Sequence, residues 1–149
     1  MKFEEKLDTS NMIKCAENFR QTLKKALEIE SHGQSILHDP EDPDFMYRFA
    51  RSAVIQIFEV TVESAWKMMQ RWVKINADNA IQEKPKRELF RTAHHSGLIS
   101  DPVVWWEFYS GRNKTSHTYH EHVAEEVYTL AKKFLPSLND FVKRLEERK

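Results

Sequence analysis

The sequence has few of the residues that interrupt helices, with 3 glycines and 5 prolines among 149 residues. This scarcity favours long helices over a β fold, which needs frequent turns. No run of 18 uncharged apolar residues occurs, so a membrane-spanning helix is not expected. Neither sign of charge is in excess, because 23 Lys and Arg balance 23 Asp and Glu. A broad electric field that would attract nucleic acid or a membrane surface is therefore excluded.

Cysteine is almost absent as well. Cys15 is the single thiol, so no internal disulfide can form and a reducing compartment is favoured. The first residues, MKFEEKLDTSNM, contain two early glutamates and no apolar segment, unlike a secretory signal. These features predict a protein of the cytoplasm that does not bind a membrane.

What the chain does contain is enough apolar material for one folded core. Hydrophobic residues make up 40% of it, including 4 Trp and 9 Phe. A chain of this length fits one domain, residues 1–149, better than two. Apolar positions recur at spacings of three or four residues, as on the buried face of a helix. The segments with this spacing are 9–29, 44–76, 84–97, 101–111 and 121–147.

The ends of these segments carry helix-capping residues. Asp101 followed by Pro102 suits a helix start, and Gly97 and Gly111 suit helix ends. Pro136 is expected to kink or split the last helix. No strand pattern competes, so the fold class predicted is all-α, an up-and-down bundle of four to five helices.

The segment 44–76 is long enough for the central helix of the bundle, with apolar surface to spare for a partner. The apolar residues that keep helical spacing in it are Phe45, Phe49, Ala53, Ile57, Val60, Ala65, Met68, Met69 and Trp72.

The most polar stretch is GRNKTSHTYHEH, residues 111–122, between the last two predicted helices. Arg112 offers a fixed fork of donors for phosphate oxygens, and His117 can move a proton near neutral pH. Together the two side chains can cleave RNA without a metal, with Asn113, Thr115 and Ser116 orienting them. The alternative is an ordinary loop, in which Arg112 caps the preceding helix and His117 bonds to backbone.

Two glutamates have a similar ambiguity. Glu59 and Glu63 lie four residues apart on one helix face, where both can hold Arg112 in an ion pair. The alternative is a solvent-facing position, with Glu63 paired to Lys67.

Basic residues at the start of the third predicted helix conflict with the positive end of its dipole. This conflict indicates an anion or an acidic partner, with a solvated face as the alternative. The candidate anion- or RNA-binding residues are Lys84, Lys86, Arg87 and Arg91, together with Lys114 from the polar stretch.

A metal site is not expected. Histidines cluster at positions 117, 120 and 122, with a pair at 94 and 95, but no acid or cysteine stands at a recognised ligand spacing. The sequence predicts no cofactor.

Three blocks, in order, resemble the nucleotidyltransferase substrate-binding proteins of the HEPN superfamily. FEVTVESAWK, residues 58–67, is similar to the family's F-E-x-x-x-E-x-x-W-K segment. PKRELFRTAHHSGLI, residues 85–99, is similar to P-R-E-x-F-R-x-A-x-x-x-G-L-I with one extra residue. RNKTSHTY, residues 112–119, fits R-N-x-x-x-H-x-Y. The likeness extends from about residue 45 to 145.

The resemblance implies a helical bundle that forms a homodimer and partners a small, separately encoded nucleotidyltransferase. In toxin–antitoxin members the HEPN subunit is a metal-independent ribonuclease, whose catalytic pair falls on Arg112 and His117. The hydroxyl that the antitoxin adenylylates falls on Tyr119. Relatives have an acidic or amide residue after this tyrosine, a better helix cap than His120, which predicts a weak start for the last helix. The alternative is a non-catalytic subunit that binds a substrate or nucleotide.

Overall fold

The computed structural model describes residues 7–32, 40–76 and 85–148, and the regular elements in them are helices. They are α1 (Ser10–His32), α2 (Phe45–Asn76), α3 (Lys86–His95), α4 (Pro102–Arg112), the short 3₁₀ helix η1 (Thr115–His117) and α5 (Glu121–Arg148). The all-α class predicted from the sequence is confirmed. Within the described ranges, no helix combines the length and the apolar character that crossing a membrane requires.

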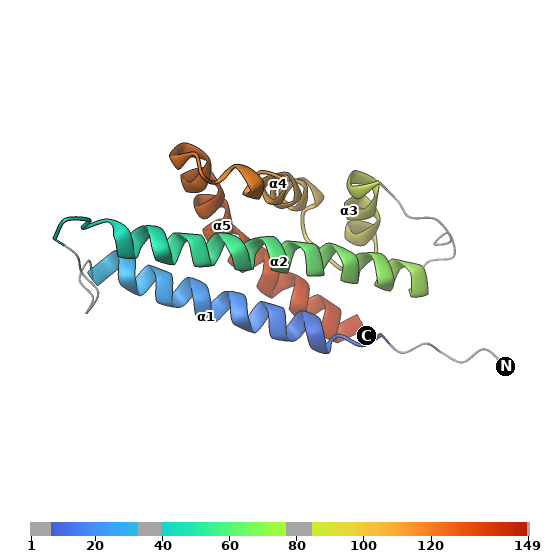
Figure 1. Ribbon diagram of the computed structural model, residues 1–149. Coiled ribbons are helices and arrows are strands. Elements are labelled where there is room, and N and C mark those ends of the chain that lie inside the picture. The colour runs from blue at the N-terminus through green and yellow to red at the C-terminus, as the bar shows by residue number, and fades with distance from the viewer. Residues whose placement is uncertain (1–6, 33–39, 77–84, 149) are drawn as a thin grey trace.

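The helices form a bundle around α2, the longest of them. Helices α1 and α2 run side by side in opposite directions, and α5 crosses behind them while contacting both (Figure 1). Helices α3 and α4 pack against each other and against α2, and α4 also contacts α5. The connection from α4 through η1 to α5 is thereby held close to α2.

Aromatic rings join four of these helices at the centre of the bundle. Phe134 of α5 meets the rings of Phe19, Phe58, Trp105 and Phe108 edge-on, with centroids 4.9 to 5.5 Å apart. Such edge-to-face pairs add to the burial of apolar area in holding helices together. The 2% exposure of Trp105 shows how completely α4 is sealed against α5.

Two helix ends follow the predicted capping chemistry. The Asp101 carboxylate accepts hydrogen bonds from the N–H groups of Val103 and Val104, at the start of α4. Gly97 has φ of +78°, a conformation that side chains disfavour, where α3 ends. The Leu98 N–H then donates to the Ala93 carbonyl at 2.9 Å, as in a Schellman motif.

The predicted end of α4 at Gly111 is one residue early, and of the kink or split expected at Pro136 the split does not occur. Helix α4 continues through Gly111 to Arg112, and Gly111 is buried where a Cβ would collide with the Leu130 side chain of α5. This glycine therefore permits a close approach of α4 and α5. Helix α5 is not split, since it continues through Pro136, which faces solvent. Water can satisfy the carbonyl that loses its N–H donor there.

In the first half of α2, most of the apolar residues noted for their helical spacing face away from the core. Phe45, Phe49 and Val60 are 45%, 60% and 45% exposed, and Ala53 is exposed too. The core side of this half is formed instead by Ala50, Arg51, Val54, Ile55 and Phe58. The predicted Ala65, Met68, Met69 and Trp72 of the second half are buried. Helix α2 consequently has apolar residues on two faces.

Candidate functional site

The polar stretch forms a compact turn between α4 and α5. Residues 113–120 contain η1, and successive backbone hydrogen bonds from Lys114 to Gly111, His117 to Lys114 and His120 to His117 close it. The hydroxyls of Thr115 and Thr118 donate to the carbonyls of Arg112 and Thr115. These bonds satisfy backbone groups within the turn itself, so the longer side chains of the segment are available for contacts with other helices.

Arg112, the last residue of α4, extends toward α2. Its Nε lies 3.2 Å from Glu63 Oε2, and its Nη2 lies 3.6 Å from Glu59 Oε1. Neither approach is a well-directed hydrogen bond, and the buried Nε has no hydrogen-bond partner among the described residues. The carboxylates therefore locate the guanidinium by charge, without a directed hydrogen bond from its Nε. The ion pairs predicted between Arg112 and the two glutamates are present. The alternative, in which Arg112 caps the carbonyls of the preceding helix, is not observed among the described residues.

Glu63 also makes the alternative contact foreseen for it. Its Oε1 lies 3.2 Å from Lys67 Nζ, and its Oε2 accepts a hydrogen bond from Trp66 Nε1 at 3.2 Å. Glu63 thus links Arg112 to a tryptophan and a lysine of α2, and the two interpretations made from the sequence hold together.

His117 ends η1 and is exposed. Its ring meets the Tyr119 ring at 6.2 Å, and no hydrogen bond ties its imidazole to another described residue. Arg112 and His117 stand at the two ends of one tight turn with no hydrogen bond between them. Asn113 and Ser116 are also exposed, and no side-chain hydrogen bond joins either of them to this pair among the described residues.

Tyr119 is the most exposed of the large hydrophobic side chains described, at 76%. Its ring lies 4.3 Å from that of His120, which lies 5.8 Å from that of His122. Although these histidines are near one another, no group of three potential metal ligands comes together within the described ranges.

The predicted anion-binding residues occupy different settings. Lys86 Nζ sits 3.8 Å from the centre of the Trp66 ring, and the Arg87 guanidinium carbon 4.4 Å from that of Trp106. Arg91 is exposed, and Lys114 makes a long, 3.8 Å ion pair with Glu126. Lys84 lies outside the described residues.

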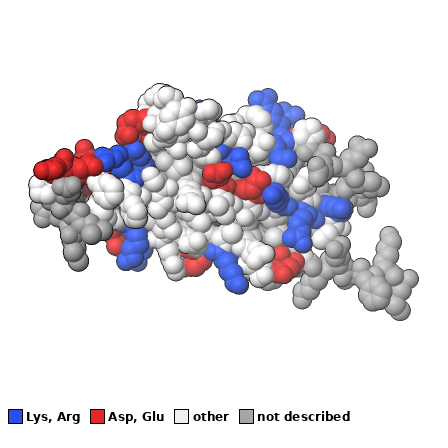
Figure 2. Space-filling view, in the orientation of Figure 1, with Lys and Arg blue, Asp and Glu red and all other residues white. Residues whose placement is uncertain are grey.

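Basic side chains gather over α3 and the last part of α2, beside acidic ones at the middle of α2 (Figure 2). Trp66 connects these regions, because it contacts both Lys86 and the Arg112 partner Glu63. The start of α3 therefore lies along a polar path to Arg112.

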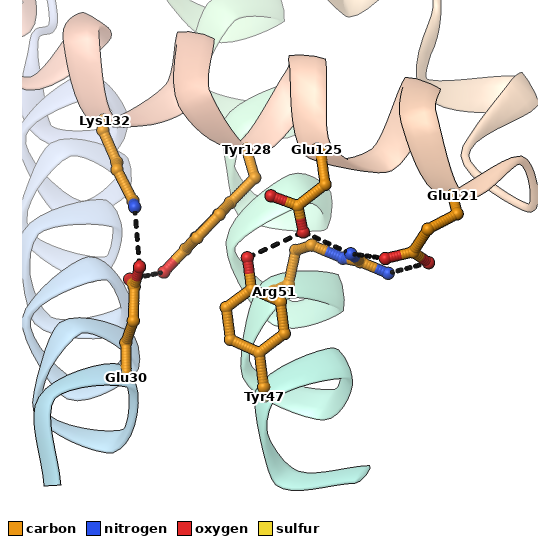
Figure 3. A network of polar contacts seen from close by, with 7 residues as sticks. All are labelled: Glu30, Tyr47, Arg51, Glu121, Glu125, Tyr128 and Lys132. Carbon is orange, nitrogen blue, oxygen red and sulfur yellow. Dashed lines mark hydrogen bonds and ion pairs between the residues drawn. The ribbon is translucent and has the colours of Figure 1, made fainter. Parts of the chain in front are cut away.

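A buried arginine that the sequence reasoning missed fixes the far end of the turn. Arg51 of α2 is 5% exposed and binds Glu121, the first residue of α5, through both terminal nitrogens at 2.6 and 2.9 Å. Its Nη1 also donates to Glu125 at 2.5 Å, and Tyr47 donates to the same oxygen (Figure 3). These contacts anchor the helix start for which His120 is a poor cap.

These charged contacts favour ionised partners. The hydrogen bond with Glu121 raises the pKa of Arg51, and the same bond lowers the pKa of Glu121. A signal for this site was present in the sequence. Arg51 precedes Val54, Ile55 and Phe58 by three, four and seven residues, which puts a cation on the core face.

The network continues to α1. Tyr128 donates to Glu30 at 2.9 Å, Lys132 binds the other oxygen of Glu30, and the Tyr47 and Tyr128 rings meet edge-on at 5.9 Å. Burial, followed by the bond to Glu30, raises the pKa of Tyr128. Three helices are thus tied together behind the turn (Figure 3).

Comparison with known proteins adds independent findings. A family model described as nucleotidyltransferase substrate binding protein like matches residues 7–147. The protein named Probable ribonuclease HepT, from Haemophilus influenzae, is 33% identical over 99 residues, which are 65% of this chain and 68% of that protein.

Two solved structures share the fold. HI0074 from Haemophilus influenzae, described as revealing the fold of a substrate binding domain of a nucleotidyltransferase, matches with a TM-score of 0.80 at 24% identity, covering 93% of this chain and 99% of that one. A protein from Thermus thermophilus matches with a TM-score of 0.59 at 21% identity, covering 85% of this chain and 98% of that one. At these identities the two structures establish a shared fold.

Proposed function

The chain belongs to the nucleotidyltransferase substrate binding protein like family, and from that premise we propose that it is a HEPN-type endoribonuclease subunit that needs no metal and is neutralised by a small nucleotidyltransferase. The similarity to a protein named as a probable ribonuclease supports the enzymatic half. The family description supports the partner. The cytoplasm, where a lone Cys15 stays reduced, suits this role.

The observation that carries the proposal is the turn with Arg112 at one end and His117 at the other. His117 takes the proton of an RNA 2′-hydroxyl, whose oxygen attacks the neighbouring phosphorus. Arg112, whose side chain is partly exposed, uses its positive charge to stabilise the charge that builds on the phosphate oxygens. The bond from phosphorus to the 5′-oxygen breaks, and that oxygen takes a proton. The products are a 2′,3′-cyclic phosphate and a 5′-hydroxyl.

RNA reaches this turn along the basic residues of α3. The Lys86 ammonium and the Arg87 guanidinium lie over tryptophan rings, which keeps their charges in place for phosphate contacts. The balanced charge of the whole chain means that binding depends on this local path.

Two chains form the working unit. The exposed Phe45 and Phe49, whose rings stack 6.2 Å apart, and Val60 give α2 an uncovered apolar face. Apolar faces of this kind mark interaction surfaces, and a second copy is the occupant that the family resemblance implies.

Tyr119 is the proposed control point. Its exposure of 76% makes the hydroxyl accessible to a nucleotidyltransferase that transfers AMP from ATP and releases pyrophosphate. The added phosphate would stand two residues from His117, where its negative charge repels the RNA backbone.

The test is cleavage of total RNA by purified protein in EDTA, beside His117→Ala. The matched control is His95→Ala, an exposed histidine on α3. We expect cleavage by the wild type and the control, with cyclic phosphate ends, and at least roughly a hundredfold loss in His117→Ala. Equal cleavage by all three would show that His117 takes no part.

A second candidate is a non-catalytic subunit that presents a substrate to the nucleotidyltransferase. The balanced charge of 23 basic and 23 acidic residues favours this candidate, because proteins that bind RNA over a broad surface carry an excess of positive charge. No cleavage above His117→Ala, together with co-elution with a small nucleotidyltransferase from size-exclusion chromatography, would establish this candidate.

A further inference from the structure

A small hollow adjoins the site on the side away from α3. It has a volume of about 180 Å³ and lies among α2, η1 and the start of α5. Its lining residues are Arg51, Ser52, Ile55, Gln56, Glu59, Thr115, Thr118 and Ala124. The lining contains a buried cation, a carboxylate, an amide and three hydroxyls, so the hollow is a polar one.

The hollow lies close to the proposed catalytic residues through two of its walls. Glu59, one wall of the hollow, is also the carboxylate 3.6 Å from Arg112 Nη2. Thr115 and Thr118, on another wall, stand on either side of His117 in the sequence. A group in the hollow therefore contacts the Glu59 partner of Arg112 and lies against the turn that carries His117.

The size of the hollow limits its occupant. One water molecule takes about 30 Å³ of liquid, so 180 Å³ corresponds to about six waters. Pockets for drug-sized ligands start at roughly 300 Å³. The hollow thus has room for one flat ring system, with the remainder of a nucleotide outside it in solvent.

The walls offer mostly acceptors. The Glu59 carboxylate only accepts, and Thr115 and Thr118 already donate their protons to backbone carbonyls, which leaves their lone pairs. Gln56 provides both a donor and an acceptor. Arg51, 5% exposed, adds positive charge beside the hollow, while its terminal nitrogens donate to Glu121 and Glu125.

We propose that this hollow is a recognition site for a guanine base next to the phosphate that Arg112 and His117 act on. The Watson–Crick edge of guanine has two adjacent N–H donors, which a carboxylate accepts side by side, and a neighbouring oxygen acceptor. Uracil has one donor on that edge, and cytosine and adenine each place theirs beside a ring acceptor that a carboxylate repels. The inference rests on the proposed ribonuclease function, to which it adds the base preference.

The first experiment measures base binding in the hollow and does not depend on RNA cleavage. Isotope-labelled protein is titrated with the four nucleoside 5′-monophosphates while amide resonances are followed by NMR. Their phosphate is common, so a difference among them reports the base. We expect GMP to shift the resonances of Gln56, Thr115 and Thr118 saturably, with about tenfold higher affinity than UMP.

Two variants sharpen the titration. Gln56→Leu removes the amide, and Ser52→Leu fills the hollow; both positions are exposed, so the fold tolerates the change. Each should weaken GMP binding about tenfold. Gln21→Leu, at an exposed glutamine of α1 outside the hollow, should leave binding as it is.

The second experiment maps cleavage sites in RNA for the wild type and Gln56→Leu. Enrichment of guanine on one side of the cut, reduced in the variant, supports the inference. Cleavage with no base preference and no GMP-specific shift overturns it while leaving the ribonuclease proposal intact. GMP-specific shifts without cleavage overturn the ribonuclease proposal and leave a guanine site.

Discussion

Among single residues, Glu63 has the most connections to the site. It lies 3.2 Å from both Arg112 Nε and Lys67 Nζ, and it accepts from Trp66 Nε1. Its negative charge is what attracts the guanidinium, since no directed hydrogen bond joins the two. A neutral side chain of the same shape would retain the bond to Trp66 and lose that attraction.

We therefore predict that Glu63→Gln lowers kcat for RNA cleavage about tenfold to a hundredfold, because misplacing a catalytic group by about 1 Å costs this much. Steady-state kinetics on a short RNA would measure it. Glu107→Gln, which removes a carboxylate paired with Lys133 on the outside of α4, should leave kcat within about twofold. A Glu63→Gln enzyme of full activity would mean that Arg112 is located by other contacts.

The raised pKa of Tyr47 predicts that the folded state loses stability at alkaline pH. Burial, followed by its bond to Glu125, raises its pKa from 10.0 to about 12. The folded state therefore keeps a proton that the unfolded chain releases above pH 10. Its contribution to stability is complete below about pH 10 and is lost as the pH rises to about 12.

We expect the urea midpoint of the wild type to fall more steeply between about pH 10 and pH 12 than that of Tyr47→Phe. At pH 8 the variant should be the less stable of the two, by about 1 kcal/mol for the lost hydrogen bond. Parallel decline of both proteins over the alkaline range would contradict this prediction.

Among the helices, ends were easier to predict from the sequence than faces. The start of α4 depends on Asp101 and Pro102 alone, and the end of α3 on Gly97, so local chemistry decides both. The face of α2 depends on what packs against it. Phe45, Phe49 and Val60 have the same helical spacing as Val54 and Phe58, and only the positions of the other helices separate the two sets.

The same limit applies to the site. Arg112 and His117 were predicted as a pair from a short motif, and the ion pairs to Glu59 and Glu63 were one of two open alternatives. Arg51 was missed because its partners, Glu121 and Glu125, are about 70 residues away in the sequence. The hydrogen bonds from Arg51 to Glu121 and Glu125 form only because α2 and α5 pack side by side in the fold, and the sequence alone does not predict that packing.

Gly111 yields a prediction about how two helices fit. Alanine is the better helix former by about 1 kcal/mol, but its methyl group would collide with Leu130 of α5. We expect Gly111→Ala to lower the free energy of unfolding by about 1–3 kcal/mol, as overpacking does. Denaturant unfolding would measure the loss, with Ser110→Ala as the neighbouring control, expected within about 0.5 kcal/mol. A more stable Gly111→Ala would mean that Leu130 moves aside freely.

For the molecule as a whole, the uncovered face of α2 predicts its assembly state. We expect a dimer by sedimentation, and a monomer after Phe49→Glu, because a charge on a buried apolar interface lacks a partner. Val103→Glu changes an apolar residue of α4 that is 67% exposed and should leave the dimer intact. A wild-type monomer, or dissociation by both variants alike, would exclude this face as the specific contact.

The ring cluster in the core has an optical consequence. Trp105 is enclosed by Phe90, Phe108, Phe134 and Phe141, so its indole is held rigidly and away from water. Fixed, dry indoles give near-ultraviolet circular dichroism and blue-shifted fluorescence; when packing loosens, the dichroism is lost and the emission shifts to the red. Because these rings come from α3, α4 and α5, the part of the spectrum that Trp105 contributes, among 4 Trp, reports whether these helices are docked. Variants of this protein can thus be checked for intact packing without an added label.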